Sequence, residues 1–351
     1  MKPVIFLLAL FVSCCAGCNN SQTTTHSASV IGEGHAPSIA TGKDGTLHIA
    51  WCTGDSIMYS FSADQGKSFA DPVFISELPG LASVNSRGPQ IGVSSLGVTV
   101  IAGNKEGNIY SFEKNGKGVW RKTARVNDQD SSAREGLMSL GGDGNSLYAV
   151  WLDMRAGHNR IYGAASADGG ESWSKNGLVY ASPDSTVCEC CKPSVAIKGN
   201  KVFVMFRNLI DGNRDLYLIQ SDDGGKVFGE AVKLGNGNWA LNGCPMDGGS
   251  LALNENGNPE TVWRRQNKIY QCEPGKPEHE IAEGRNCSMT ILNGKNVYVW
   301  NEKGKIVSLF PDNKKQSLGD GAFPVVKAVN KEKVIYVWEN EKQIHTAVLS
   351  L

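Results

Sequence analysis

Three copies of one short pattern decide the fold of this chain: SADQGKSF at residues 62–69, SADGGESW at residues 166–173 and SDDGGKVF at residues 221–228. Each copy places Ser, Asp, Gly and an aromatic residue at the same spacing. Ser and Asp side chains hydrogen-bond the backbone of a tight turn, and Gly accepts a positive φ. The pattern therefore predicts three hairpin corners, with Asp64, Asp168 and Asp223 as their structural aspartates.

A longer unit repeats around these corners. It comprises a strand of small residues, a β-branched strand that often ends in Trp, and a third strand, at the period of about 40 to 50 residues typical of four-stranded propeller blades. Seven units follow one another from about His35 to the end, and weak marks in the fifth and sixth leave six as the alternative. The last unit lacks a fourth strand, which residues 28–31 can supply to close the ring. The expected fold is an all-β propeller over residues 28–351.

The three corners resemble the Asp-box (BNR) repeats of the sialidase-like propeller superfamily. The resemblance implies the propeller fold. It implies no single function, because the same corner occurs in glycosidases, receptors and photosystem assembly factors. In such a propeller the Asp-box corners join the third and fourth strands on one rim, and ligands generally bind at the opposite face.

The N-terminal residues predict export. A short apolar run, Val4–Val12, follows one basic residue and is too short for a permanent membrane span. The small-small-Cys ending resembles a bacterial lipobox with Cys18 as the lipidated residue, although Cys15 stands where Leu is usual; an ordinary cleaved signal peptide is the alternative. We expect a signal peptide at 1–17, a flexible tether at 18–27, and a lipid-anchored protein of the bacterial cell envelope, at the outer membrane or the periplasmic or extracellular face.

The charge balance limits the classes of partner. Basic and acidic residues number 35 each, which argues against a global field that attracts nucleic acid or an anionic bilayer. Membrane contact is expected only through the N-terminal lipid. We expect a monomer whose partner is a small molecule, a glycan or a metal ion.

The cysteines concentrate on one face. Of ten, three belong with the leader, and six of the remaining seven fall opposite the Asp-box rim: Cys52, Cys188, Cys190, Cys191, Cys244 and Cys287. Cys272 falls on the Asp-box side. Export permits disulfides, and bonds from the Cys188–Cys191 cluster to Cys244 or Cys287 are sterically easier than bonds within it.

Thiolates that converge also suit a soft metal ion, Cu(I) or Zn(II). The two interpretations are compatible, because one disulfide still leaves several ligands, and an odd number of cysteines leaves at least one thiol unpaired. The candidate metal ligands are Cys188, Cys190, Cys191, Cys244 and Met246, with His35 as a further candidate.

The sialidase resemblance implies a particular active site. Sialidases of this superfamily hold a carboxylate with three arginines, because planar bidentate donors suit it, and use a Tyr–Glu nucleophile pair and an Asp acid/base. The first arginine normally lies in Arg-Ile-Pro, and the comparable place here reads His35-Ala36-Pro37. The remaining catalytic candidates are Arg87, Arg207, Arg214 and Asp215, with Tyr270 or Tyr298 as nucleophiles.

Other residues of that face are candidate ligand contacts. Arg155, Asp247 and His35 lie in its loops. Trp239 breaks the rhythm of the strand-ending tryptophans, in a Gly/Asn-rich loop just before Cys244, and is the aromatic residue expected to touch a ligand. The strand-ending tryptophans themselves are expected to pack between blades.

The segments at 188–193, 206–215 and 239–245 resemble a subgroup of exported bacterial proteins that carry a Cys-x-Cys-Cys motif and are labelled sialidase-like for their fold. We therefore expect a lipoprotein that binds a soft metal or an anionic or glycan group at its axial cysteine- and arginine-bearing face. One alternative is an exo-sialidase or related glycoside hydrolase acting on acidic glycans. Another is a non-catalytic scaffold stapled by disulfides.

Overall fold

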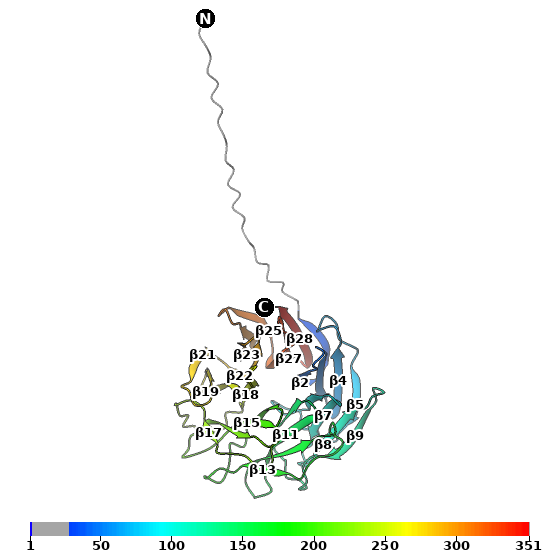
Figure 1. Cartoon of the computed structure of the whole chain (residues 1–351), viewed down its shortest axis with the longest axis vertical. Helices are drawn as coiled ribbons and strands as arrows, with labels where there is room; N and C mark the ends of the chain where they lie inside the picture. The colour runs from blue at the N-terminus through cyan, green and yellow to red at the C-terminus, as the bar shows by residue number, and fades with distance from the viewer. Residues whose placement is uncertain (2–27, 351) are drawn as a thin grey trace.

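The chain folds into a ring of β-sheets. The computed structural model describes Met1 and residues 28–350. In this part of the chain the regular structure forms seven four-stranded antiparallel sheets arranged around an axis (Figure 1). The predicted seven-bladed propeller is therefore confirmed, and six blades is wrong. The signal peptide at 1–17, Cys18 and the tether at 18–27 fall, apart from Met1, outside the described residues and stay predictions.

The blades follow chain order. Blade 1 contains β2 (His35–Thr41), β3 (Leu47–Thr53), β4 (Ser56–Ser62) and β5 (Val73–Glu77). Blade 2 contains β6 (Gln90–Ser94), β7 (Gly97–Gly103), β8 (Ile109–Lys114) and β9 (Trp120–Arg125). Blade 3 contains β10 (Met138–Asp143), β11 (Ser146–Asp153), β12 (Arg160–Ser166) and β13 (Gly177–Tyr180). Blade 4 contains β14 (Ser194–Lys198), β15 (Lys201–Arg207), β16 (Leu216–Ser221) and β17 (Val232–Lys233).

The remaining blades complete the ring. Blade 5 contains β18 (Gly249–Leu253), β19 (Pro259–Arg265), β20 (Lys268–Cys272) and β21 (His279–Glu283). Blade 6 contains β22 (Arg285–Leu292), β23 (Lys295–Glu302), β24 (Lys305–Leu309) and β25 (Lys315–Asp320). Blade 7 contains β26 (Ala322–Ala328), β27 (Lys333–Asn340), β28 (Gln343–Ser350) and β1 (Ser29–Glu33). Among the described residues there is no helix long and apolar enough to cross a membrane.

The first strand of each blade lies nearest the axis, since these strands contact one another around the ring, β2 against β26 included. The ring closes as the sequence predicts. β1, from the N-terminal side of blade 1, pairs with β28, so that Ser29 lies opposite Thr346 and Glu33 opposite Gln343. This pairing covers the backbone edge that β28 would otherwise expose.

Tryptophans at the ends of the second strands fill the space between blades, as expected. The indoles of Trp51, Trp300 and Trp338 are at most 1% exposed. Two of the glycines packed on these rings, Gly284 and Gly321, have φ values of 149° and 153°, and a methyl group on either would collide with the indole of its own blade. Glycine is needed there because a Cβ atom at Gly284 would overlap Trp300 Cδ1 and one at Gly321 would overlap Trp338 Cδ1.

The Asp-box corners form where they are expected, between the third and fourth strands of blades 1, 3 and 4. At the first corner Ser62 Oγ accepts the Gly66 N–H over 2.8 Å, and Asp64 accepts the Ser68 N–H over 3.0 Å. The second and third corners repeat these bonds around Asp168 and Asp223. Each aspartate therefore has the structural role that the sequence predicts.

Two of these corners also join neighbouring blades. The Thr99 hydroxyl of blade 2 donates to the Gly169 carbonyl over 2.6 Å, and the Tyr148 hydroxyl of blade 3 donates to the Gly225 carbonyl over 3.1 Å. Corner and preceding blade are thus held together on one rim. The connections that precede the first strands lie on the other rim, where the candidate residues gather.

Candidate functional site

Three cysteines meet before the first strand of blade 4. The Sγ atom of Cys188 lies 3.7 Å from that of Cys190 and 3.5 Å from that of Cys191, and the last two are 4.0 Å apart. All three side chains are buried, and Met246 packs against them from the connection to blade 5. These four residues are the cysteine cluster. The structure thus brings together three predicted sulfur ligands and places Met246 beside them.

A disulfide ties this cluster to the next blade. Cys190 is bonded to Cys244, which lies in the connection that leads to β18. Cys188 and Cys191 are free thiols, as are Cys52, Cys272 and Cys287. Cys190 is buried whereas Cys244 is exposed, so the bond joins the interior of the cluster to the surface. The prediction that a bridge would leave the cluster for a distant cysteine is confirmed.

The environment of Cys188 favours its thiolate. The sulfur atoms of Cys188 and Cys191 share a hydrogen bond over 3.5 Å, and Arg214 Nη1 donates a second bond to Cys188 Sγ over 3.1 Å. The hydrogen bond between Cys188 and Cys191, aided by the charges of Arg207 and Arg214 and opposed by burial, lowers the pKa of Cys188 to about 6. Burial and the bond to Cys188 raise the pKa of Cys191 well above its ordinary value. These opposite shifts favour a thiolate at Cys188 and a thiol at Cys191.

Arg207 is a buried structural cation at 1% exposure. Its guanidinium donates to the backbone carbonyls of Asp247, Arg214 and Arg264 over 2.7 to 3.1 Å. These bonds tie the end of β15 to blade 5. They leave the positive charge without a bound carboxylate, next to the cysteine cluster, where it offsets thiolate charge.

Trp239 lies against the same cations. Its ring is 5.2 Å from the guanidinium carbon of Arg207 and 5.4 Å from that of Arg264. At 6% exposure it presents little surface to a ligand, and its backbone N–H donates to the Asp215 carboxylate over 2.9 Å. Asp215 also pairs with Lys233 over 3.0 Å. Trp239 and Asp215, predicted as ligand-contact and catalytic residues, thus have protein partners that brace this loop.

The remaining predicted residues are spread around the face. Arg87 bonds Glu135, and Arg155 holds Asp153 in a bidentate pair with N–O distances of 2.9 Å. His35 lies at the blade 7 side of blade 1, near Glu339. Arg87, Arg207 and Arg214 therefore serve three different sets of protein partners, which gives the predicted carboxylate clamp no geometric support.

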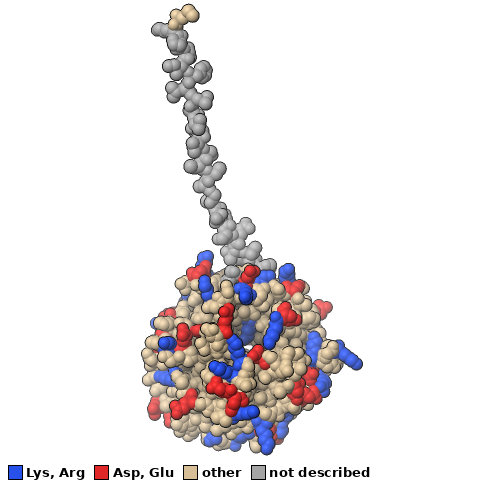
Figure 2. Space-filling model, in the orientation of Figure 1, with Lys and Arg blue, Asp and Glu red and all other residues tan. Residues whose placement is uncertain are grey.

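A cavity of about 190 Å³ occupies the axis. Seven residues that contribute to its wall are Ser38, Arg87, Gln90, Lys192, Asp247, Cys287 and Lys327. Figure 2 shows basic side chains beside the hollow at the centre of the viewed face. Among the cysteines of the described residues, Cys287 lines this cavity. The cysteine cluster lies beside the axis and not on it. The sequence analysis places both at the axis, but the Cys188 N–H donates to the Arg207 carbonyl of β15, which holds the cluster against the second strand of blade 4.

Five serines form a belt around this axis at equivalent positions of the first strands. They are Ser38, Ser139, Ser194, Ser250 and Ser288. Several join one blade to the next: the Ser139 hydroxyl donates to the Pro193 carbonyl over 2.6 Å, and that of Ser194 to the Gly249 carbonyl over 2.5 Å. Ser250 and Ser288 instead accept backbone N–H groups of the following blade.

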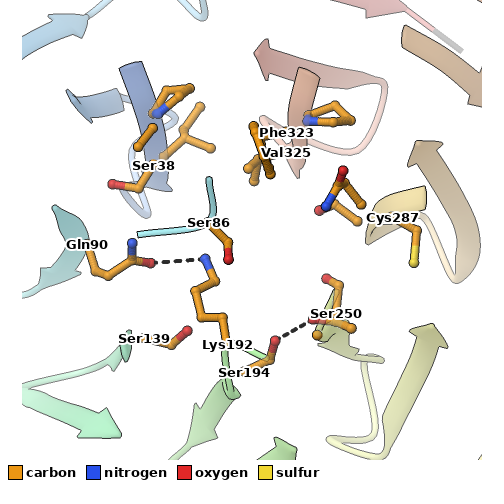
Figure 3. Close-up of a pocket in the computed structure, with 18 of the residues that line it drawn as sticks. Ser38, Ser86, Gln90, Ser139, Lys192, Ser194, Ser250, Cys287, Phe323 and Val325 are labelled. Carbon is orange, nitrogen blue, oxygen red and sulfur yellow. Dashed lines mark hydrogen bonds between the residues drawn. The ribbon is translucent and has the colours of Figure 1, made fainter. Parts of the chain in front are cut away.

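Lys192 extends into the cavity from the start of blade 4, towards Gln90 of blade 2 (Figure 3). Burial and the positive charge of Lys327 lower its pKa to about 8. Burial alone lowers the pKa of Lys327. Sequence reasoning missed both lysines and the serine belt. The serine that recurs at the same position of the first strand in five repeat units is the sequence signal that could have predicted the belt.

Asp247 connects the cavity with the cysteine cluster. It is 4% exposed, and burial raises its pKa, opposed by the Asn286 N–H at 2.9 Å and by Arg207 and Arg264. Its carboxylate lies 3.3 Å from Arg264 Nη1. The predicted ligand-binding aspartate is therefore engaged by protein donors.

No protein-family model matches the chain, and no curated protein matches it significantly. Solved structures do match. Virginiamycin B lyase from Staphylococcus aureus is 14% identical, with a TM-score of 0.53 over 92% of this chain and 97% of that chain. An ulvan lyase of a polysaccharide lyase family is 11% identical, with a TM-score of 0.54 over 93% and 95%. The intramolecular trans-sialidase from Ruminococcus gnavus is 12% identical, with a TM-score of 0.49 over 94% and 95%. At such identities the likeness shows the fold alone, a β-propeller.

Proposed function

We propose that this protein is an exported, lipid-anchored propeller that binds a soft metal ion, Cu(I) or Zn(II), through Cys188, Cys190 and Cys191. The separations of their sulfurs carry the proposal. They are 3.7, 3.5 and 4.0 Å. In a tetrahedral site with metal–sulfur bonds of about 2.3 Å, ligand sulfurs lie roughly 3.8 Å apart. The three sulfurs therefore already have the spacing of metal ligands, and Cys190 becomes available as a ligand when its bond to Cys244 is reduced.

Two neighbouring sulfurs can complete the site. Cys244 is already bonded to Cys190, and the Met246 side chain packs on the three cysteines. Thiolate and thioether ligands suit Cu(I), and four thiolates suit Zn(II). Arg214 and Arg207 offset the negative charge of bound thiolates, because both already favour the Cys188 thiolate.

The metal-binding form is the reduced form, since a sulfur in a disulfide is a poor ligand. An external dithiol supplies two electrons and two protons to the Cys190–Cys244 bond and becomes a disulfide itself. The four cysteine thiols are then available, and metal binding releases the protons of the thiols that become ligands. Export and the lipid anchor at Cys18 rest on the N-terminal sequence pattern alone.

The test is an anaerobic titration of the reduced protein with Cu(I), against a competing chelator, and with Zn(II). We expect about one tightly bound ion, and losses of at least tenfold in affinity in Cys188→Ser and in Cys191→Ser. Cys272→Ser is the matched control, because Cys272 is buried on the opposite rim and donates to backbone carbonyls that a serine also reaches. Affinity that is unchanged in both cluster variants would overturn the proposal.

A glycoside hydrolase is the less favoured function. The observation against it is the dispersion of Arg87, Arg207 and Arg214 among separate protein partners. Hydrolysis of a fluorogenic sialoside by the wild type, but not by Arg214→Ala, would favour the glycoside hydrolase over the metal-binding function.

A further inference from the structure

Two lysines share the axial cavity without a carboxylate partner. Lys192 contributes from the segment before β14, and Lys327 from β26 on the far side of the ring. The ammonium group of Lys192 has one hydrogen bond, to Gln90 Oε1 over 3.4 Å. Among the described residues, Lys327 has neither a hydrogen bond nor an ion pair from its ammonium group. The two charges are near enough to disfavour each other.

The other charged groups in the wall are already engaged. Arg87 donates to Glu135, and the Asp247 carboxylate is bound by Arg264 and by the Asn286 N–H. Neither neutralises the lysines. Burying a charge without a partner is costly, so buried cations in proteins are usually paired or face a ligand. Lys192 and Lys327 are half-buried in the wall of one cavity, and no carboxylate of the described residues pairs with either, so an anionic ligand would compensate both charges.

Uncommitted hydroxyl donors surround the same space. Ser250 and Ser288 accept backbone N–H groups, so the hydrogen of each hydroxyl remains free to donate. Ser86 lies beside the end of Lys192 (Figure 3), and its hydroxyl has no protein partner among the described residues. The hydroxyl hydrogens of Ser139 and Ser194 are already donated, to the backbone carbonyls of Pro193 and Gly249. The cavity thus offers two ammonium groups and three hydroxyl donors.

From these observations we infer that the axial cavity is a binding site for a compact, doubly charged oxyanion, of the sulfate or hydrogen phosphate type, held between Lys192 and Lys327. The cavity of about 190 Å³ is large enough to admit one tetrahedral oxyanion together with water. Two positive charges match two negative ones, and the hydroxyls of Ser86, Ser250 and Ser288 satisfy the remaining oxygen lone pairs. The oxyanion is either a free inorganic ion or the terminal ester group of a larger ligand, such as a sugar.

Calorimetric titration at pH 7 and low ionic strength tests the site. The probes are sodium sulfate, sodium phosphate and glucose 6-phosphate, with sodium chloride at matched ionic strength as the reference. We expect saturable binding of at least one inorganic dianion, and a loss of at least tenfold in Lys192→Met and in Lys327→Met. Binding of the sugar ester at least as tight as that of inorganic phosphate assigns the site to an ester ligand, and weaker binding assigns it to the free ion.

Lys268→Met is the control, because Lys268 is exposed and paired with Glu280 on the outer part of blade 5. An equal loss of dianion affinity in this control would show that net charge alone causes the effect and would overturn the inference. A heat signal no larger than that of sodium chloride would overturn it as well. If a methionine variant does not fold, Lys192→Gln and Lys327→Gln keep a polar head and serve instead.

Thermal unfolding gives a second readout, because the order of the wild-type and variant melting temperatures should depend on whether a dianion is present. Without dianions, Lys192→Met should melt at or above the wild-type temperature, since mutual repulsion of the lysines is removed. With sulfate the wild type should gain stability, and the variant should not. The site is also separable from the proposed metal centre: Lys192→Met should retain Cu(I) binding, and Cys188→Ser should retain sulfate binding.

Discussion

The guanidinium group of Arg214 donates a hydrogen bond to the sulfur of Cys188 over 3.1 Å. This contact joins two residues that lie in different connections of blade 4, one before its first strand and one before its third. It brings a second guanidinium group, besides that of Arg207, close to a buried thiol. The contact acts together with the hydrogen bond between Cys191 and Cys188 and with the charge of Arg207 to favour the Cys188 thiolate.

Arg214→Gln should raise the pKa of Cys188 above its value of about 6, because it removes a charge and a charged donor from the thiolate. The reduced protein should then show its first rise in thiolate ultraviolet absorbance at higher pH. Cys188→Ser identifies that rise, and Arg155→Gln is the control, since Arg155 pairs with Asp153 and Asp128. An unchanged midpoint in Arg214→Gln would refute the role given to the cation.

Cys244→Ser should lower the free energy of unfolding by about 2 to 4 kcal/mol. The Cys190–Cys244 bond closes a loop of 54 residues, and a cross-link of that length restricts the unfolded chain by an amount in this range. Urea unfolding of oxidised wild type, reduced wild type and the variant measures it. The reduced wild type should match the variant, and Cys272→Ser should keep the oxidised stability. Identical stabilities in all samples would show that the bond does not constrain folding.

His48→Gln should flatten the pH dependence of stability between pH 6.5 and 4. His48 is 9% exposed, and its Nδ1 lies 2.7 Å from the Tyr59 hydroxyl oxygen. Burial, aided by the charge of Lys114, lowers its pKa from 6.5 to about 4. The folded state therefore binds this proton less readily than the unfolded chain, so the stabilisation is complete above pH 6.5 and is lost as the pH falls through 4.

The loss should approach about 3 kcal/mol at most, at 1.4 kcal/mol per pH unit over this window. Urea unfolding at pH 7, 5.5 and 4.5 measures the slope, which separates the proton effect from the lost hydrogen bond to Tyr59. His279→Gln is the control, because His279 is exposed. A slope that matches in His48→Gln and the wild type would contradict the prediction.

Removal of residues 1–33 should destabilise the ring, whereas removal of residues 1–27 should not. The longer deletion takes away β1, which pairs with β28 and whose Glu33 carbonyl accepts the Trp51 indole N–H over 2.8 Å. An exposed β28 edge should also promote self-association. Thermal unfolding and light scattering of the two truncated proteins measure both effects. Equal melting temperatures would show that β1 contributes nothing to closure.

The sequence by itself determined the propeller, because its signals are local. A Ser, an Asp and a Gly at fixed spacing form the Asp-box corner from bonds within five residues, as Ser62, Asp64 and Gly66 show. The recurring strand triplets set the number of blades, and chain direction then assigns each connection to a rim. The face that carries Cys188, Cys244 and Cys287 could be predicted on that basis alone.

Only the tertiary structure decided which of these residues meet. Cys190 bonds Cys244, Arg207 turns its guanidinium to backbone carbonyls, and Lys192 comes near Lys327 across the axis. Each contact joins different blades or their connecting segments, so it depends on the ring radius and on side-chain rotamers that no local spacing encodes. Local hydrogen bonds fix the corners and strands, whereas the distances that decide the chemistry arise when seven blades close into one ring.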